Sequence, residues 1–249
     1  MTGVDIATSH GPARADLAVP GGDGLPSFLL VLTHGAGGSV DAPDLLAVRD
    51  AVLQAGGATA LVTQPYRVRG ARAPGSAARQ DEAWQEIIAF LHAGPWFSPG
   101  ETRLSAGEAR LSAGEAPPSG QAPPGPGLPL IVGGRSNGAR VACRTAAVVG
   151  ARGIIALAFP LRPPSRRAVA GSAAAPDPPA RDAELRAAAE AGARVLVVNG
   201  DKDPFGIPDP GTAIRVVVLE GESHSLSRNP AAVADAVTRW LSGVVPLVP

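Results

Sequence analysis

The feature that most constrains the fold is a short apolar run that ends in a serine flanked by glycines. Residues 128–132 read Leu-Pro-Leu-Ile-Val, and the sequence Gly-Gly-Arg-Ser-Asn-Gly that follows places Ser136 between Gly134 and Gly138 in a G-x-S-x-G pattern. We expect a buried strand, a sharp turn that carries Ser136, and the start of a helix. In such a turn the serine has a strained backbone conformation and its hydroxyl is exposed at the end of the sheet. Glycine is needed on both sides because a side chain would collide where strand and helix nearly touch.

The rest of the chain alternates between apolar runs and amphipathic segments. Continuous apolar runs are typical of strands buried on both faces, and apolar residues at helical spacing indicate the helices between them. The predicted strands are 14–20, 28–33, 58–63, 128–132, 153–159, 194–199 and 214–219. The predicted helices are 41–55, 77–92, 137–149, 180–191 and a closing helix that begins near Asn229. This alternation predicts an α/β fold with a mainly parallel central sheet of about six to eight strands and helices on both faces.

Three local details accompany this prediction. We expect the strand 14–20 to form an edge of the sheet, and Asp41 to cap the N-terminus of the first helix. The arginine-rich stretch that holds Arg67, Arg69 and Arg72 is predicted to be a loop.

Two proline-rich segments interrupt the alternation. Residues 94–127 contain an immediate tandem repeat of Arg-Leu-Ser-Ala-Gly-Glu-Ala, and we expect a disordered insertion there rather than a functional lid. Residues 160–179 follow the end of a predicted strand, where ligands bind in open α/β sheets, so this segment is a candidate cover for a site. We therefore expect one α/β domain over residues 27–249, interrupted by 94–127 and preceded by an N-terminal edge segment, 1–26.

The composition argues against several classes of partner. The chain of 249 residues has 22 basic and 22 acidic residues and a formal net charge of zero, so it lacks the basic excess that is typical of nucleic-acid and membrane-surface binders. Cys143 is the only cysteine, so no internal disulfide can form. The sequence has neither a signal-peptide core nor an apolar run long enough to span a membrane. We expect a cytoplasmic protein with no nucleic-acid or membrane partner, and the composition leaves the oligomeric state open.

Two further side chains that can accept or donate a proton follow predicted strands on the C-terminal side of Ser136. Asp203 lies in Gly-Asp-Lys-Asp-Pro after the strand 194–199, and His224 lies in Gly-Glu-Ser-His after the last strand. Taken singly, a serine in a glycine-rich turn, an aspartate before proline and a histidine near a helix start are ordinary turn or cap residues. In a parallel sheet, however, all three lie at the same edge, and their order along the chain is the Ser…Asp…His order of α/β-hydrolases.

With these motifs, the chain resembles the α/β-hydrolase superfamily over roughly residues 27–242. The resemblance also rests on a His-Gly-Ala-Gly-Gly loop, residues 34–38, after the strand 28–33. Within the superfamily, this loop and the G-R-S-N-G turn are similar to a dienelactone-hydrolase-like group. That group includes relatives of the animal testis-expressed protein TEX-thirty and of a subunit of the NSL acetyltransferase complex.

The resemblance implies a role for each motif residue. Ser136 would be the nucleophile, His224 would accept and later return its proton, and Asp203 would fix the imidazole tautomer and stabilise its cation. The backbone N–H groups of Asn137 and Ala36 would form the oxyanion hole.

Gly37 and Arg135 are the expected substrate-binding residues. Two roles remain open for Arg135: its guanidinium could recognise an anionic acyl group, or it could pair with a carboxylate and hold the serine turn. His34 is interpreted as a structural partner, and Cys143 as a packed small hydrophobic residue. No cluster of His, Asp or Glu has metal-ligand spacing, so neither a metal nor another cofactor is predicted.

These features predict a serine hydrolase that cleaves an ester or thioester of a small to medium acyl group through an acyl-enzyme. The low aromatic content, three Trp, one Tyr and five Phe, makes a long-chain lipase less favoured. Peptidase or dehalogenase chemistry is compatible with the fold, although haloalkane enzymes have an aspartate where Ser136 stands. The alternative is a catalytically silent interaction module, and the complete set of three chemical groups argues against it. Specificity is expected to reside mainly in the loops 65–76 and 160–179.

Overall fold

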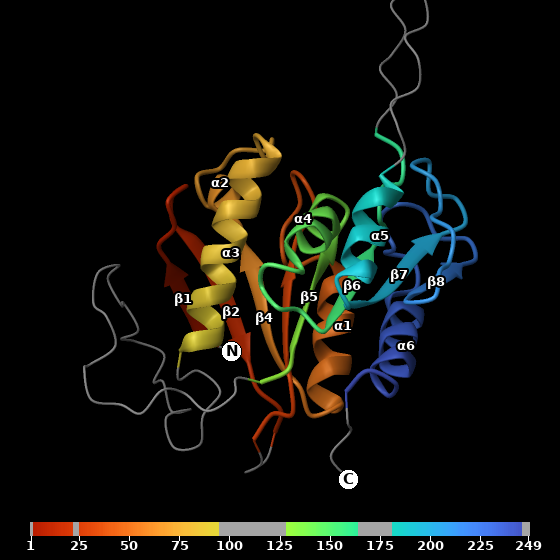
Figure 1. Cartoon of the computed structure of the whole chain (residues 1–249), viewed down its shortest axis with the longest axis horizontal. Coiled ribbons are helices and arrows are strands. Elements are labelled where there is room, and N and C mark those ends of the chain that lie inside the picture. Colours follow the sequence, from red (N-terminus) through yellow and green to blue (C-terminus); the bar gives the residue numbers. More distant parts are fainter. Residues whose placement is uncertain (1, 22–24, 95–127, 164–180, 246–249) are drawn as a thin grey trace, which may run out of the picture.

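A computed structural model describes residues 2–21, 25–94, 128–163 and 181–245. These residues form one eight-stranded sheet with helices on both faces (Figure 1), which confirms the predicted fold class. The strands are β1 (Thr2–Ile6), β2 (Ala13–Ala18), β3 (Leu29–Thr33), β4 (Ala58–Thr63), β5 (Leu130–Arg135), β6 (Gly153–Leu157), β7 (Arg194–Gly200) and β8 (Ile214–Leu219). The predicted insertion, apart from Gly94, and most of the predicted cover segment lie outside the described residues.

The strand order in the sheet is β1-β2-β4-β3-β5-β6-β7-β8. The pairs β1–β2 and β2–β4 are antiparallel, and every other neighbouring pair is parallel. The prediction that 14–20 forms an edge strand was wrong, because β2 lies between β1 and β4. The edge is β1, whose five residues place only Val4 and Ile6 in the core, too short a pattern for sequence reasoning to identify.

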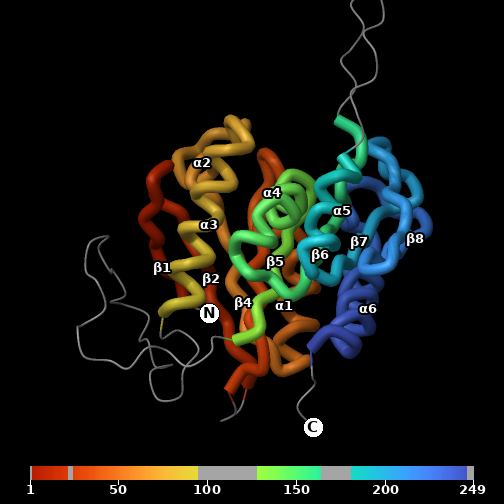
Figure 2. Tube along the Cα trace, in the orientation of Figure 1, coloured from red at the N-terminus to blue at the C-terminus, as the bar shows by residue number. Residues whose placement is uncertain are grey.

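The helices are α1 (Pro43–Gln54), α2 (Pro65–Val68), α3 (Ala77–Ala93), α4 (Asn137–Thr145), α5 (Asp182–Glu190) and α6 (Pro230–Leu241). One face of the sheet packs against α3, α4 and α5, and the other packs against α1 and α6, as the ribbon and the tube show (Figures 1 and 2). Each face has its own apolar core, because side chains alternate between the two sides of every strand. Within the described parts of the chain, no helix is long and apolar enough to cross a membrane.

Two local predictions for helices require correction. The N-cap of α1 is Ala42 and no side chain caps it; the helix begins with Pro43, whose missing N–H needs no cap, so Asp41 is left outside as an exposed residue. Arg67 lies in the short helix α2 rather than in a loop, because Pro65 pre-sets the helical φ at its first position. By contrast, α6 begins as predicted, with the Asn229 side chain accepting a hydrogen bond from Ala232 N–H at 3.1 Å.

The parallel strands bring distant segments of the chain to one edge of the sheet. The ends of β3 and β5 are in register, with Thr33 opposite Gly134, and the ends of β7 and β8 pair Gly200 with Leu219. The loops that carry His34, Ser136, Asp203 and His224 all begin at these carboxyl ends. This edge is the upper one in Figure 1, where α2 and the start of α3 also lie.

Candidate active site

Ser136 occupies a single-residue turn between β5 and α4. Its backbone has φ 53° and ψ −112°, a conformation that residues other than glycine rarely adopt. The Ser136 N–H donates to the Leu157 carbonyl at 2.8 Å, which ties the turn to the end of the neighbouring strand β6. The strained residue is therefore held by hydrogen bonding in the sheet, with its hydroxyl at the carboxyl edge.

The two glycines around Ser136 are explained by close backbone approach. A Cβ on Gly134 would lie 2.7 Å from the Thr33 carbonyl oxygen, and a Cβ on Gly138 would lie 2.7 Å from the His34 carbonyl oxygen. Both distances are shorter than real Cβ atoms tolerate, and the obstacle in each case is backbone. Only glycine at these positions lets the end of β3 lie directly against the serine turn.

Three side chains from separate loops form a continuous hydrogen-bonded chain. His224 Nε2 lies 2.8 Å from Ser136 Oγ, and His224 Nδ1 lies 2.8 Å from Asp203 Oδ2. The Asp203 side chain is fully buried, whereas the His224 side chain is 23% exposed. The structure thus brings together the serine, histidine and aspartate that the sequence singled out, with the imidazole between the hydroxyl and the carboxylate. Asp201, the other acidic residue of this loop, is exposed.

The carboxylate of Asp203 is fixed by groups that the sequence analysis did not single out. Phe205 N–H donates to its Oδ1 at 2.9 Å, and the buried Asn199 amide donates to its Oδ2 at 3.3 Å. Asn199 also accepts from Phe159 N–H and donates to the Phe159 carbonyl, which joins the ends of β6 and β7. The asparagine in an otherwise apolar strand, Val-Leu-Val-Val-Asn, was the available signal for this role.

The loops of Asp203 and His224 are attached to each other. Lys202 N–H donates to the Glu222 carbonyl at 2.9 Å, and Gly200 lies so close to that carbonyl that a Cβ would collide with it. The Phe205 ring meets the His224 imidazole edge to face, with ring centroids 4.5 Å apart. These contacts restrict the imidazole to one position between its two partners.

The glycine-rich loop 34–38 lies beside the serine. A Cβ on Gly35 would be 3.3 Å from the Cβ of Ser136, and the loop is closed by a Gly38 N–H to Gly35 carbonyl hydrogen bond of 3.0 Å. Ala36 and Gly37 are exposed, and Gly37 has a φ of 70°. Arg67 in α2 donates to the Gly38 carbonyl at 2.8 Å, a support for the loop that sequence reasoning missed.

His34 is a buried structural residue, in agreement with its interpretation from the sequence. Its Nε2 accepts a hydrogen bond from Gln64 N–H at 3.1 Å, and its ring packs edge to face against Tyr66. Burial lowers the pKa of His34, since a charged imidazole would lose its hydration there. Cys143, in α4, is buried in the core, and burial raises the pKa of its thiol.

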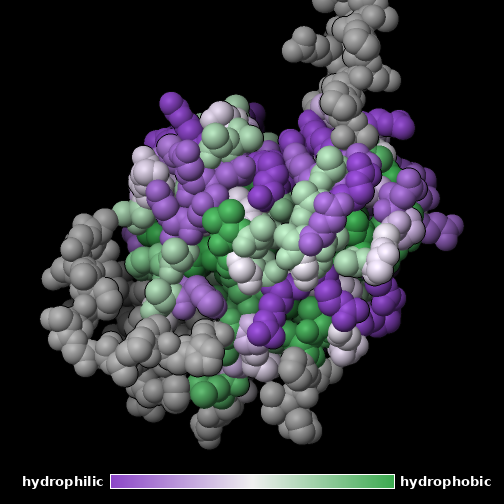
Figure 3. Space-filling view, viewed as in Figure 1, coloured by the Kyte–Doolittle hydropathy of each residue, from purple (hydrophilic) through white to green (hydrophobic). Residues whose placement is uncertain are grey.

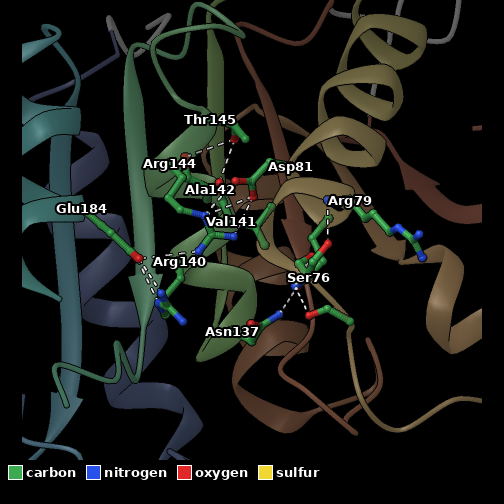
Figure 4. A network of polar contacts seen from close by, with 12 residues as sticks. Ser76, Arg79, Asp81, Asn137, Arg140, Val141, Ala142, Arg144, Thr145 and Glu184 are labelled. Carbon is green, nitrogen blue, oxygen red and sulfur yellow. Dashed lines mark hydrogen bonds and ion pairs between the residues drawn. The ribbon is translucent and has the colours of Figure 1, made fainter. Parts of the chain in front are cut away.

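The side chain of Asn137 points away from the proposed reaction centre and joins α4 to α3. Its amide donates to Gln80 Oε1 at 2.6 Å, and Gln80 donates in turn to the carbonyl of Ser76, which caps α3. Figure 4 shows this contact beside a second link, in which Arg144 of α4 binds Asp81 of α3. Helix α4 is therefore joined to α3 at both ends: by Asn137, directly after Ser136, and by Arg144 in its last turn.

Arg135 contacts protein groups within the fold. Its Nη2 donates to the His224 carbonyl at 3.3 Å, and its Nε lies 3.5 Å from Oδ2 of the buried Asp44. Of the two roles that the sequence left open for Arg135, these contacts match pairing with a carboxylate. Asp44, in the first turn of α1, is a further site residue that the sequence analysis did not identify.

A cavity of about 480 Å³ lies between α2 and the start of α3, and none of Ser136, Asp203 and His224 lines it. Its lining includes Tyr66, Arg69, Arg79 and Gln80, so it reaches the residue that binds the Asn137 side chain. Hydrophilic side chains gather over α2 and the start of α3 in the space-filling view (Figure 3), and the cavity lining there includes the cationic side chains of Arg69 and Arg79. Among the described residues, no group of three or more His, Cys, Asp or Glu could hold a metal ion.

Comparisons with known proteins agree with this architecture. Residues 121–232 match a family model described as "Alpha/beta hydrolase domain". No curated protein matches the chain in sequence. Among solved structures, an α/β serine hydrolase without a lid from Xanthomonas campestris is 15% identical with a TM-score of 0.66, over 100% of this chain and 96% of that chain. An α/β serine hydrolase homologue from Coxiella burnetii is 15% identical with a TM-score of 0.65, over 97% and 98% of the two chains.

A third similar structure is a dienelactone hydrolase from Anabaena variabilis, 17% identical with a TM-score of 0.65, over 97% of this chain and 96% of that chain. At such identities the likeness concerns the fold. The narrower likeness to the TEX-thirty group stays a prediction.

Proposed function

We propose that this chain is a serine hydrolase of the α/β-hydrolase superfamily that cleaves esters or thioesters of small to medium acyl groups. The observation that carries the proposal is the unbroken path from the Ser136 hydroxyl through the His224 imidazole to the Asp203 carboxylate, with 2.8 Å at each step. A hydroxyl is a weak nucleophile unless an adjacent base accepts its proton, and this arrangement supplies that base.

In the acylation step, Ser136 Oγ attacks the substrate carbonyl carbon while His224 Nε2 takes the hydroxyl proton. Asp203 accepts the Nδ1–H of His224, which fixes the required tautomer and stabilises the imidazolium that forms. His224 then gives the proton to the departing alkoxide or thiolate, and the acyl group remains bound to Ser136 as an ester. Water attacks this ester with His224 again as the base, which releases the acid and restores the Ser136 hydroxyl.

Negative charge on the substrate oxygen needs donors that are already in place. The backbone N–H of Asn137 at the start of α4 and that of Ala36 in the glycine-rich loop are the proposed donors. Support comes from the contact between Gly35 and Ser136, the Arg67 hydrogen bond to Gly38, and the anchoring of Asn137 by Gln80. Loss of one such donor typically costs about 2.7–4 kcal/mol of transition-state stabilisation.

The cavity beside α3 is the proposed location of the acyl group. Its volume of about 480 Å³ lies within the range of small-molecule pockets, and its lining residue Gln80 binds the side chain of Asn137, the residue after Ser136. This size favours a small to medium acyl chain. Cytoplasmic location and the absence of nucleic-acid partners remain expectations from the sequence.

The direct test is hydrolysis of p-nitrophenyl acetate by purified wild-type protein and by Ser136→Ala. The proposal predicts turnover by the wild type and a loss of at least about 10³-fold in the variant, since residual rate enhancement comes only from binding and the oxyanion donors. Equal turnover by the two proteins would contradict the proposal. A wild type without activity that binds a partner protein stoichiometrically would support the silent interaction module instead.

A further inference from the structure

We propose that Arg135 is a positioning residue for the proposed general base: its guanidinium, held by the buried carboxylate of Asp44, fixes the backbone of His224 against the serine turn. This role rests on the proposed function, because it concerns how the contact between Ser136 Oγ and His224 Nε2 is maintained. Of the two roles that the sequence left open for Arg135, it extends the pairing with a carboxylate and replaces the binding of substrate.

The contacts of Arg135 connect the nucleophile and the base by a second route. Arg135 is the last residue of β5 and is covalently joined to Ser136, while its Nη2 donates to the carbonyl oxygen of His224 at 3.3 Å. One residue therefore fixes both ends of the contact between Ser136 Oγ and His224 Nε2. Any displacement of the histidine loop relative to the serine turn must break the Arg135 hydrogen bond.

Asp44 supplies the charge that keeps this guanidinium in place. Its side chain is fully buried in the first turn of α1, and its Oδ2 lies 3.5 Å from Arg135 Nε. Among the described residues no side chain donates a hydrogen bond to either carboxylate oxygen, and Arg135 Nε has no hydrogen-bond acceptor; the only N–H groups that act on the carboxylate are the backbone ones of Asp44 and Leu45. A buried carboxylate that no side chain hydrogen-bonds is costly unless a cation lies close by, so Asp44 and Arg135 stabilise each other.

The loop of His224 adds a second buried carboxylate to this cluster. Glu222 is buried two residues before His224, its Oε1 accepts from Asn229 N–H at the start of α6, and its charge acts on Asp44. Burial raises the pKa of Asp44 and Glu222 raises it slightly further, whereas the charge of Arg135 and the backbone N–H groups of Leu45 and Asp44 lower it. Arg135 thus neutralises a site to which α1 and the histidine loop each contribute a carboxylate.

The alternative role, recognition of an anionic acyl group, requires a free donor facing the substrate. The Arg135 side chain is only 21% exposed, one of its nitrogens donates to protein backbone and another lies against Asp44. The two roles make different kinetic predictions. Loss of a positioning residue lowers kcat equally for all substrates. Loss of a residue that binds an acyl carboxylate raises KM, and it does so only for substrates that carry such a carboxylate.

The experiment compares wild type, Arg135→Met and Arg135→Lys on p-nitrophenyl butyrate and on the mono-p-nitrophenyl ester of succinic acid, which carries a free carboxylate. We expect Arg135→Met to lower kcat by on the order of 10–100-fold on both esters with little change in KM. Arg135→Lys, which keeps the charge beside Asp44, should recover part of the loss. A rise in KM confined to the succinate ester would overturn the proposal.

Two variants separate positioning from a general loss of folding. Arg135→Met leaves Asp44 buried and unpaired, so the double variant Arg135→Met/Asp44→Leu replaces both charges by apolar groups and should restore stability without restoring kcat. Recovery of kcat in the double variant would overturn the proposal. Arg215→Met, a matched change at an exposed arginine near the amino end of β8, should leave both stability and kcat unchanged.

A readout independent of turnover distinguishes failure of this inference from failure of the proposed function. The His224 ring nitrogens, assigned by comparison with His224→Ala in an ¹⁵N NMR spectrum, should show the hydrogen-bonded signature in wild type and lose it in Arg135→Met. A wild type without turnover but with this loss would refute the proposed function and retain the positioning role. An unchanged His224 spectrum in Arg135→Met would refute the positioning role, whatever the activity.

Discussion

Nε2 of His224 lies 2.8 Å from Oγ of Ser136, although 88 residues separate the two along the chain. The contact depends on the parallel sheet, which ends β5 and β8 at one edge, and on the loops that leave those ends. On one side the serine turn is fixed by glycines that touch β3; on the other, the imidazole is held by Asp203 and Phe205. Each of these supports can be removed separately.

Replacing Asp203 by Asn should leave the fold intact and remove most of the activity. An amide can still accept from Phe205 N–H, but its NH₂ group would face Nδ1 of His224 and favour the tautomer whose Nε2 carries a proton. That tautomer cannot accept the Ser136 proton, so we expect kcat to fall by on the order of 10⁴-fold.

The matched control is Asp201→Asn, since Asp201 is exposed and two residues away in the same loop. Its steady-state kinetics should equal those of the wild type. Equal losses in the two variants would mean that the loop, rather than the Asp203 carboxylate, is responsible.

The sequence was sufficient for the parts of the molecule that depend on local pattern. Apolar runs located the strands from β3 to β8, and the order of Ser136, Asp203 and His224 identified three groups that the structure brings into contact. Asp44 was not predictable, because its partner Arg135 is far away in sequence. Nothing near Asp44 in the sequence reveals its contact with Arg135. Asn199 lies only four residues before Asp203, and its place at the end of an apolar run was a signal that the sequence analysis did not use.

The short edge strand β1 was missed for a related reason. Its two buried side chains give too little periodicity, and its position follows only from pairing with β2. The cap predicted for α1 failed because Pro43 can begin a helix without a capping side chain.

Gly138→Ala should disrupt the serine turn. The added methyl would lie 2.7 Å from the His34 carbonyl oxygen and 2.9 Å from that of Thr33, and backbone atoms at the end of a central strand cannot move away easily. We expect a loss of about 1–3 kcal/mol in the free energy of unfolding, measured by urea denaturation, together with a lower kcat. Gly21→Ala is the control, because a Cβ there meets no atom within 4 Å. A stable and fully active Gly138→Ala protein would contradict the close approach.

Asn137→Ala should affect stability more than catalysis. The change leaves Gln80 Oε1 without its 2.6 Å partner, which costs about 1–3 kcal/mol in the free energy of unfolding when the acceptor is buried. The proposed oxyanion donor is the main-chain N–H, which alanine retains, so kcat should stay within about tenfold of wild type. The double variant Asn137→Ala/Gln80→Ala should cost less than the sum of the two single changes. A loss of kcat above about 100-fold with unchanged stability would show that the side chain itself acts on the substrate.

The buried imidazole of His34 should make stability depend on pH. Its pKa in the folded protein lies below the ordinary value of 6.5, so the unfolded chain binds a proton at a higher pH than the folded chain does. The free energy of unfolding should therefore fall as the pH is lowered through 6.5 towards the folded pKa. His34→Gln, which can still accept from Gln64 N–H, should have a smaller dependence over this interval in denaturant titrations. Parallel pH curves for wild type and variant would rule out this contribution.

The central claim, that Ser136 is a nucleophile activated by His224, is tested most directly by mapping a fluorophosphonate adduct with peptide mass spectrometry. Trypsin cleaves after Arg135 and Arg140, and the resulting peptide Ser-Asn-Gly-Ala-Arg contains one hydroxyl group. We predict a stoichiometric adduct on this peptide in wild type, a far slower reaction in His224→Ala and no adduct in Ser136→Ala. A wild type that forms no adduct there, or one that reacts equally fast without His224, would contradict the account.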